Sequence, residues 1–365
     1  MGKKILLAGC GLLAMLGTAA RADHLVAIAG PMTGQYASAG DQIRKGAEMA
    51  IADINGKGGV LGQPLKLEIG DDACDPKQAV SVANTMVNKK IVFMHGHWCS
   101  SSTIPASDVY NESQIPMATV STNPQVTARG LKNLFRILGS DDQQGPVAGG
   151  HLADVFKGKK IAVVDDKSSY GKGLADEMAK GMRARGVDPA LRESITAGEK
   201  DYSGLVSKMK SAGVEVMAYG GYHTEVALIL RQAQQAGLDL TVMGGDTMAN
   251  MELVTAAGAL ANNVLFTFPP DPRKNPNAAD VVKRFRDAKI EPEGYVMVAY
   301  AAMQLFAQAA EQAKGVKYAD LEKALRGGSF DTVIGTLAFD EKGNNKQPGF
   351  MVYRWKDGKY DYVSK

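Results

Sequence analysis

The hydroxyl-rich segment from Gly96 to Thr103 contains the residue types best suited to binding chemistry. It follows an apolar run that predicts a strand and precedes a stretch that predicts a helix. At such a junction, hydroxyls and free backbone N–H groups can receive an anion, and the helix dipole favours negative charge. The segment therefore predicts a carboxylate site, with the alternative that one hydroxyl only caps the helix.

A metal site is the second interpretation of this region. His95, His97 and Cys99 alternate and would share one face of an extended strand. Zinc accepts such ligands, but no His-plus-carboxylate helix motif completes the set, and Cys99 has a competing role in a disulfide. We therefore predict neither a metal site nor a cofactor.

The sequence lacks the motifs of the common catalytic centres. There is no Gly-x-Ser-x-Gly elbow, no phosphate loop ending in Gly-Lys-Ser/Thr, and no dinucleotide fingerprint after the first strand. Ser100 near His97 could imitate a nucleophile and its base, but strand alternation would place them on opposite sides. A binding protein is favoured over an enzyme.

Short apolar runs alternate with longer amphipathic ones along most of the chain. This order is typical of parallel sheets covered by helices. We expect strands at residues 25–29, 65–69, 91–94, 161–164 and 214–219, and helices around 43–54, after Asp75-Pro76, from Gly171, over 224–236 and over 295–313. The break at 141–146 begins a second series, and the prolines near 268–272 end it.

The length suits two domains better than one core. We predict two α/β lobes, the first formed by residues 23–140 plus 269–350 and the second by 141–268 plus 351–365; that both are doubly wound is implied by the family resemblance described below. No short repeat or low-complexity tract interrupts this pattern.

The N-terminus has the order of a secretory signal peptide. Lys3 and Lys4 precede an apolar run, and Ala20-Arg21-Ala22 supplies small residues for cleavage, so residues 1–22 are expected to be removed and the protein to be exported; the family resemblance described below implies that it is periplasmic. Cys10 is expected to leave with the signal. The remaining pair, Cys74 and Cys99, predicts a disulfide in an oxidising compartment, with two unpaired buried thiols as the alternative.

The charge balance excludes two classes of partner. The 42 basic residues of the precursor fall to 39 once Lys3, Lys4 and Arg21 are removed, and there are 39 acidic residues. A formally neutral chain lacks the basic field that nucleic-acid binding needs. It also has no polybasic block for anionic lipid.

Several blocks of the sequence closely resemble the periplasmic leucine/isoleucine/valine-binding proteins of ABC importers. They lie in family order and span nearly the whole mature chain. The blocks are residues 71–80, 96–103, 127–130, 170–175, 195–201, 219–223 and 331–343. The resemblance implies a type I periplasmic-binding fold with three hinge crossings, and a disulfide between Cys74 and Cys99.

The resemblance also implies how a ligand is held. The carboxylate of the ligand is expected at Ser100 and at Ser121-Thr122 of the first lobe, whose neutral donors leave no unpaired charge in an empty cleft. The ammonium is expected at Asp246 of the second lobe, near Tyr170 and Tyr222. The alternatives are packing aromatics, a turn at Thr122 and a helix cap at Asp246. Some relatives carry the longer glutamate at the position of Asp246.

Specificity is expected to come from Trp98 and Tyr295, which form apolar walls, and from the region of Ala39. An aromatic residue expected near Ala39 is missing, so that the pocket is either enlarged or filled by Tyr36. Apolar walls favour an uncharged side chain. Leucine, isoleucine and valine are the leading ligands, with phenylalanine or a small polar amino acid as further candidates.

The function expected from the resemblance is capture of an amino acid by closure of the lobes and delivery to the membrane subunits of an ABC importer. A soluble sensing partner of a membrane receptor is the alternative, since it can use the same fold. We expect the protein to act as a monomer.

Overall fold

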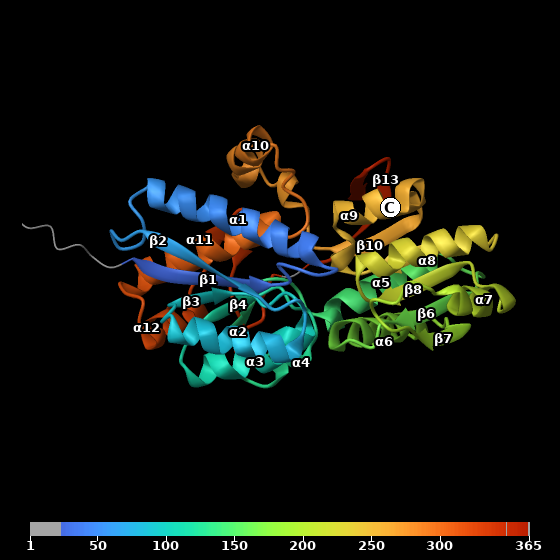
Figure 1. The fold of residues 1–365 in the computed structure, drawn as a ribbon, viewed down its shortest axis with the longest axis horizontal. Coiled ribbons are helices and arrows are strands. Elements are labelled where there is room, and N and C mark those ends of the chain that lie inside the picture. The colour runs from blue at the N-terminus through green and yellow to red at the C-terminus, as the bar shows by residue number, and fades with distance from the viewer. Residues whose placement is uncertain (1–22, 348, 364–365) are drawn as a thin grey trace, which may run out of the picture.

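Two separate β-sheets divide the chain into two lobes, which lie side by side in Figure 1. The computed structural model describes residues 23–347 and 349–363, so the predicted signal peptide and Cys10 lie outside the described residues. None of the helices within these residues combines the length and apolar character needed to cross a bilayer.

The sheet of the first lobe is wholly parallel. Its strands are β1 (His24–Gly30), β2 (Leu65–Asp71), β3 (Phe93–His95), β4 (Met117–Thr119) and β5 (Leu134–Arg136), in the order β2-β1-β3-β4-β5. β1 is buried over almost its whole length, as expected for a central strand covered by helices on both faces.

The sheet of the second lobe has seven strands in the order β14-β13-β10-β9-β8-β6-β7. The strands are β6 (Ile161–Asp165), β7 (Leu191–Ser194), β8 (Val216–Gly220), β9 (Thr241–Gly244), β10 (Val264–Phe268), β13 (Met351–Lys356) and β14 (Lys359–Tyr362). β6 to β10 are parallel, as predicted, whereas β13 and β14 form an antiparallel hairpin that the sequence analysis did not anticipate.

Helices cover both sheets. The first lobe carries α1 (Ala37–Gly56), α2 (Pro76–Asn88), α3 (Ser100–Glu112), α4 (Gln125–Ala128), α10 (Ala279–Asp287), α11 (Val296–Ala313), α12 (Tyr318–Gly327) and the small hairpin β11 (Phe330–Thr332) and β12 (Gly335–Leu337). The second carries α5 (Asp141–Val155), α6 (Ser169–Arg183), α7 (Ser203–Ser211), α8 (His223–Gln235), α9 (Met251–Ala257) and the 3₁₀ turns η1 (Asp246–Met248) and η2 (Gly258–Asn263). Two further 3₁₀ turns, η3 (Pro272–Lys274) and η4 (Pro276–Ala278), lead to α10.

Most predicted elements are present, with shifted ends. Asp75 caps α2 by accepting a hydrogen bond from the N–H of Gln78, as the Asp-Pro signal predicts. The strand predicted at 91–94 is wrong by two residues. Lys90 is left-handed and the N–H of Ile91 still bonds to Met86 at the end of α2, so β3 cannot begin until Phe93.

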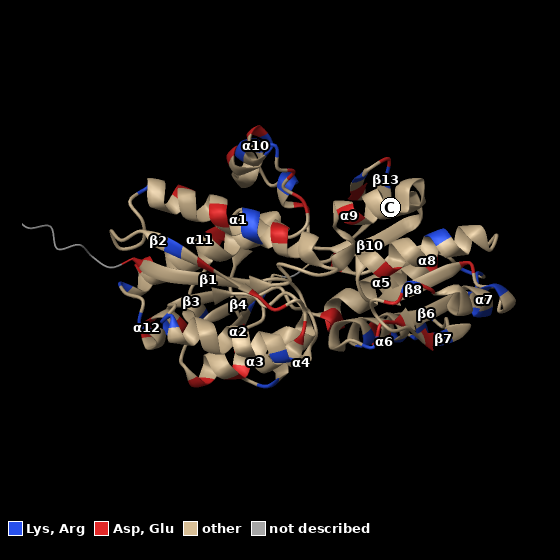
Figure 2. Ribbon diagram, viewed as in Figure 1, with Lys and Arg blue, Asp and Glu red and all other residues tan. Residues whose placement is uncertain are grey.

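The chain passes between the lobes three times, after β5, after β10 and between β12 and β13. The lobes are closed on each other. Tyr36 of the first lobe contacts the ring of Tyr222 of the second, and Asn123 donates a hydrogen bond to the carbonyl of Ser169 across the cleft. Lys, Arg, Asp and Glu are interspersed over the helices of both lobes in Figure 2, in keeping with the balanced composition.

Candidate functional site

In each sheet the strand order reverses once, between β1 and β3 in the first lobe and between β6 and β8 in the second. Open α/β sheets bind ligands outside the carboxyl ends of the strands at such a switch point. Trp98 and Ser100 follow β3, Tyr170 follows β6 and Tyr222 follows β8. All four side chains are buried, and the rings of Trp98 and Tyr170 both contact the ring of Tyr222, which joins the two switch points.

The first lobe contributes hydroxyl groups to this region. Ser100 is the first residue of α3 and is buried; its Oγ accepts a hydrogen bond from the N–H of Asn123 at 3.4 Å. The N-cap of α3 is Cys99 and no side chain caps the helix, so the alternative of a capping hydroxyl is not what the structure shows. The carbonyl of the buried Thr122 accepts the N–H of Asp141 at 2.8 Å, which fixes the loop opposite Ser100.

The hydroxyl of Ser121 forms hydrogen bonds within the first lobe, and its predicted contact with a ligand stays a prediction. Its hydroxyl lies within hydrogen-bond distance of the His97 and Trp98 carbonyls, at 3.1 and 3.0 Å, and of the Thr103 hydroxyl at 2.6 Å. These contacts occupy the hydroxyl within the first lobe. Ser121 therefore ties the loop of residues 96–100 to its neighbour.

The residues considered for a metal are engaged elsewhere. Cys99 is joined to Cys74, with Cα atoms 5.5 Å apart, so the predicted disulfide is confirmed. His97 Nδ1 lies 2.5 Å from the buried carboxylate of Asp72, and His95 Nδ1 lies 3.0 Å from the carbonyl of Ala118. No group of three His, Cys, Asp or Glu residues in the described part of the chain is arranged to hold a metal ion.

Asp246 is the acidic centre on the second lobe. It is 3% exposed and is the first residue of η1. The N-cap of η1 is Gly245, so Asp246 is not the helix cap that the sequence analysis gave as the alternative. Its carboxylate accepts hydrogen bonds from the hydroxyls of Tyr170, at 3.2 Å, and Tyr295, and from the amide of Gln144 at 3.2 Å. Burial raises the pKa of Asp246, and these donors lower it in part.

The sequence analysis missed a second carboxylate, that of Asp141. It is fully buried, and no donor in the described chain reaches either oxygen with good hydrogen-bond geometry, although the Thr122 hydroxyl faces it. Burial, followed by the charge of Asp246, raises the pKa of Asp141 well above its usual range. The sequence signal that could have indicated Asp141 is the capping box of Ser140 and Gln143, which begins α5 and places Asp141 in its first turn. The sequence analysis identifies this segment only as a break.

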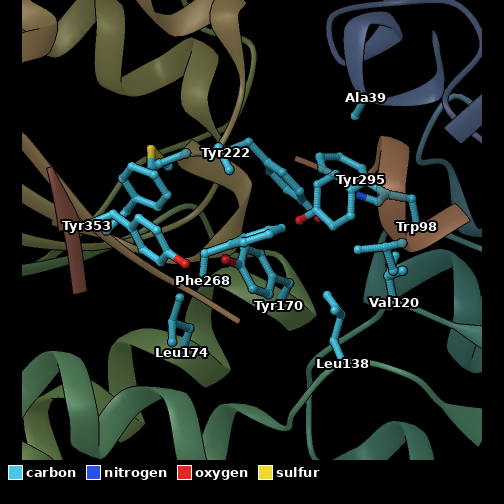
Figure 3. Close-up of a cluster of buried hydrophobic side chains, with 14 of the residues drawn as sticks. Ala39, Trp98, Val120, Leu138, Tyr170, Leu174, Tyr222, Phe268, Tyr295 and Tyr353 are labelled. Carbon is cyan, nitrogen blue, oxygen red and sulfur yellow. The ribbon is translucent and has the colours of Figure 1, made fainter. Parts of the chain in front are cut away.

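Aromatic rings form the wall of the site. Trp98 contacts Tyr222 at 5.2 Å between centroids and Tyr295 edge-on at 5.5 Å, and Tyr170 contacts Tyr222 at 5.4 Å. In Figure 3 these four side chains lie together, with Val120 and Leu138 on the side of the first lobe. The rings bring residues from both lobes into one apolar surface.

The position near Ala39 is resolved in favour of Tyr36. Ala39 is buried in the first turn of α1 and is drawn beside the cluster in Figure 3. The ring of Tyr36 lies 4.3 Å from that of Tyr222 and 6.1 Å from that of Trp98, between centroids. An aromatic side chain thus reaches this wall from one turn earlier in the sequence.

Comparison with known proteins agrees with this geometry. Residues 25–359 match the family model described as periplasmic binding protein. The chain is 47% identical, over 99% of both chains, to the Leu/Ile/Val-binding protein homolog 1 of Brucella melitensis. The chain belongs to the leucine/isoleucine/valine-binding family of periplasmic binding proteins. The matching family is described as one of binding proteins, which agrees with a substrate-binding role.

Other members extend the comparison. The leucine-, isoleucine-, valine-, threonine- and alanine-binding protein of Pseudomonas aeruginosa is 45% identical over 90% of this chain and 89% of its own. A branched-chain amino acid transporter substrate-binding protein from Streptococcus pneumoniae, solved in complex with isoleucine, superposes with a TM-score of 0.84 at 25% identity, covering 94% and 99% of the two chains. The fold is therefore the type I periplasmic-binding fold, as predicted.

Proposed function

We propose that this member of the leucine/isoleucine/valine-binding family captures a branched-chain or other apolar amino acid between its lobes and delivers it to an ABC importer after export to the periplasm. The observation that carries the proposal is the pair of buried carboxylates, Asp141 and Asp246, opposite buried neutral donors. Names of the relatives and the isoleucine complex support the ligand class.

The charges of the site match a zwitterion. Burial raises the pKa of both carboxyls; the charge of Asp246 further raises the pKa of Asp141, and the charge of Arg136 lowers it in part. A ligand ammonium would supply positive charge and remove much of the cost of ionising the two carboxyls. The ligand carboxylate would then lie toward Ser100 and Thr122, where hydroxyl and backbone donors are neutral.

The aromatic wall selects the side chain of the ligand. Trp98, Tyr222 and Tyr295 offer ring faces and edges to a ligand side chain. The hydroxyl of Tyr295 donates to Asp246. An aliphatic side chain removes apolar surface from water against these rings at about 25 cal/mol per Å². Leucine, isoleucine and valine suit such a wall best.

The proposal is tested by a calorimetric screen of the refolded, ligand-free mature protein against the twenty amino acids. Binding of leucine, isoleucine or valine with one ligand per chain is expected. A protein that binds none of the amino acids would overturn the proposal. Delivery is tested separately, by transport assays in vesicles that contain the membrane subunits of a candidate ABC importer.

Ser100→Ala is expected to weaken binding of the preferred amino acid by about 1 to 3 kcal/mol, because the ligand carboxylate loses one buried donor. Titration calorimetry measures the loss. Ser101→Ala, one residue further along α3, is the matched control and should bind as the wild type does. An unchanged affinity in Ser100→Ala would remove this serine from the ligand site.

Binding is expected to weaken as the pH falls from neutral toward the usual pKa range of aspartate. The pKa values of Asp141 and Asp246 are raised in the empty protein by burial, and a bound ammonium favours their ionised forms. Binding therefore releases protons, and affinity is lost where those carboxyls become protonated. Calorimetry in two buffers of different ionisation enthalpy measures the released protons; an affinity independent of pH between 8 and 5 would contradict the expectation.

A further inference from the structure

A polar cluster joins the lobes at the start of α1, away from the carboxylates of the site. Ser38 of the first lobe lies 2.5 Å from a carboxylate oxygen of Glu252 and 2.9 Å from the amide nitrogen of Asn250, both in the second lobe. His223, the first residue of α8, lies 3.5 Å from the same hydroxyl and 3.0 Å from Glu252. One serine thus meets three side chains across the cleft.

Local structure fixes the three partners of Ser38. Asn250 is the N-cap of α9, and its side-chain oxygen accepts the N–H of Glu252 at 2.9 Å, which leaves the amide N–H group for Ser38. His223 is 1% exposed and its Nδ1 has no partner in the described chain, so the ring donates through Nε2. The hydrogen bond from His223 lowers the pKa of Glu252, so its carboxylate is charged.

The first turn of α9 forms a further hydrogen bond with the first lobe. The N–H of Met251 donates to the carboxylate of Glu293 at 3.1 Å, and Glu293 lies two residues before Tyr295 in the first lobe. The first turn of α9 therefore bonds with the first lobe through two successive residues. That turn follows η1, which carries Asp246, and Tyr36 lies two residues before Ser38.

We propose that Ser38, Asn250, His223 and Glu252 form a latch between the lobes that stabilises the closed state and lengthens the residence time of the bound ligand. The inference rests on the proposed closure of the lobes over an amino acid. Bonds made only in the closed state lower its free energy relative to the open state, and so slow ligand release without changing the contacts to the ligand. The latch residues are positioning residues, because no ligand atom needs to touch them.

Stopped-flow fluorescence of the full mature chain tests the latch, with Trp98 in the cleft as reporter and leucine as the ligand. Ser38→Ala is expected to raise the dissociation rate about five- to tenfold, with the association rate within about twofold of wild type, since lost bonds of this kind act on release. Ser81→Ala, an exposed serine on α2, is the matched control. An unchanged dissociation rate in Ser38→Ala would overturn the latch.

A double-mutant cycle separates the latch from general damage to the fold. Glu252→Ala should also speed release. The double variant Ser38→Ala/Glu252→Ala should speed release by clearly less than the product of the two single effects, because each single substitution already removes the bond between Ser38 and Glu252. Thermal unfolding of the ligand-free variants should be close to wild type. Independent, multiplicative effects on release would count against a shared latch.

A ligand-independent measurement keeps the latch testable if leucine does not bind. Probes on cysteines introduced at the exposed Lys57 of the first lobe and Arg231 of the second report the distance between the lobes by electron-spin resonance. In the ligand-free protein, Ser38→Ala should lower the closed fraction. A lowered closed fraction in a protein that binds no amino acid would retain the latch and reject the proposed function, whereas an unchanged closed fraction would reject the latch.

Discussion

Asp246→Asn is expected to weaken binding of the preferred amino acid by about 2 to 5 kcal/mol, which is the usual loss when one partner of a buried charge pair is removed. Asparagine keeps the shape of the side chain but has one acceptor oxygen where aspartate has two, so it can accept the hydroxyl of Tyr170 or of Tyr295 but not both, and it offers no charge to an ammonium. Titration calorimetry with leucine, isoleucine and valine measures the loss.

A control variant and a ligand analogue separate the effect of the Asp246 charge from other effects of the substitution. Asp142→Asn removes an exposed carboxylate next to Asp141 and should leave the affinity unchanged. 4-Methylpentanoate, which is leucine without its ammonium group, should bind weakly to the wild type and no more weakly to Asp246→Asn. If leucine binds both proteins equally, Asp246 is a structural residue of the second lobe and the ammonium lies elsewhere.

The disulfide is expected to contribute about 3.5 kcal/mol to the free energy of unfolding. It closes a loop of 25 residues, and that value is the chain entropy removed from the unfolded state for a loop of this length. The variant Cys74→Ala/Cys99→Ala should therefore unfold at a lower urea concentration, as measured by circular dichroism with linear extrapolation.

The position of the bridge adds a functional consequence. Cys99 directly precedes Ser100, so the bridge ties the end of α3 that we propose to bind the ligand carboxylate to the loop after β2. Treatment of the wild type with a reductant is the matching control and should reproduce the stability of the double variant. A free energy of unfolding equal to that of the oxidised wild type would show that the bridge acts on neither state.

The sequence by itself determined the two-lobed α/β design, part of the strands and helices in their order along the chain, and the disulfide. These depend on local patterns, since apolar runs and amphipathic stretches are read within a few residues. The hairpin of β13 and β14 was within reach as well. Asp357-Gly358, both with positive φ, joins two alternating strands and is a typical two-residue turn that we passed over.

The resemblance located the site residues by position but could not assign their partners. Ser121 lies beside Thr122 in sequence, yet its hydroxyl is bonded to the carbonyls of residues 97 and 98, which the sequence does not place nearby. Tyr36 and Ala39 were alternatives until the helix α1 was seen to begin at Ala37, with Tyr36 as the N-cap residue whose ring reaches Tyr222.

Only the tertiary structure decided which groups meet across the cleft. Asp141 and Asp246 are 105 residues apart in sequence, and Ser38 and Glu252 are 214 apart. Local pattern cannot pair such residues, because their distance depends on how two sheets stack their switch points face to face. Burial and the charges of distant carboxylates, which set the pKa values of the site, exist only after that stacking.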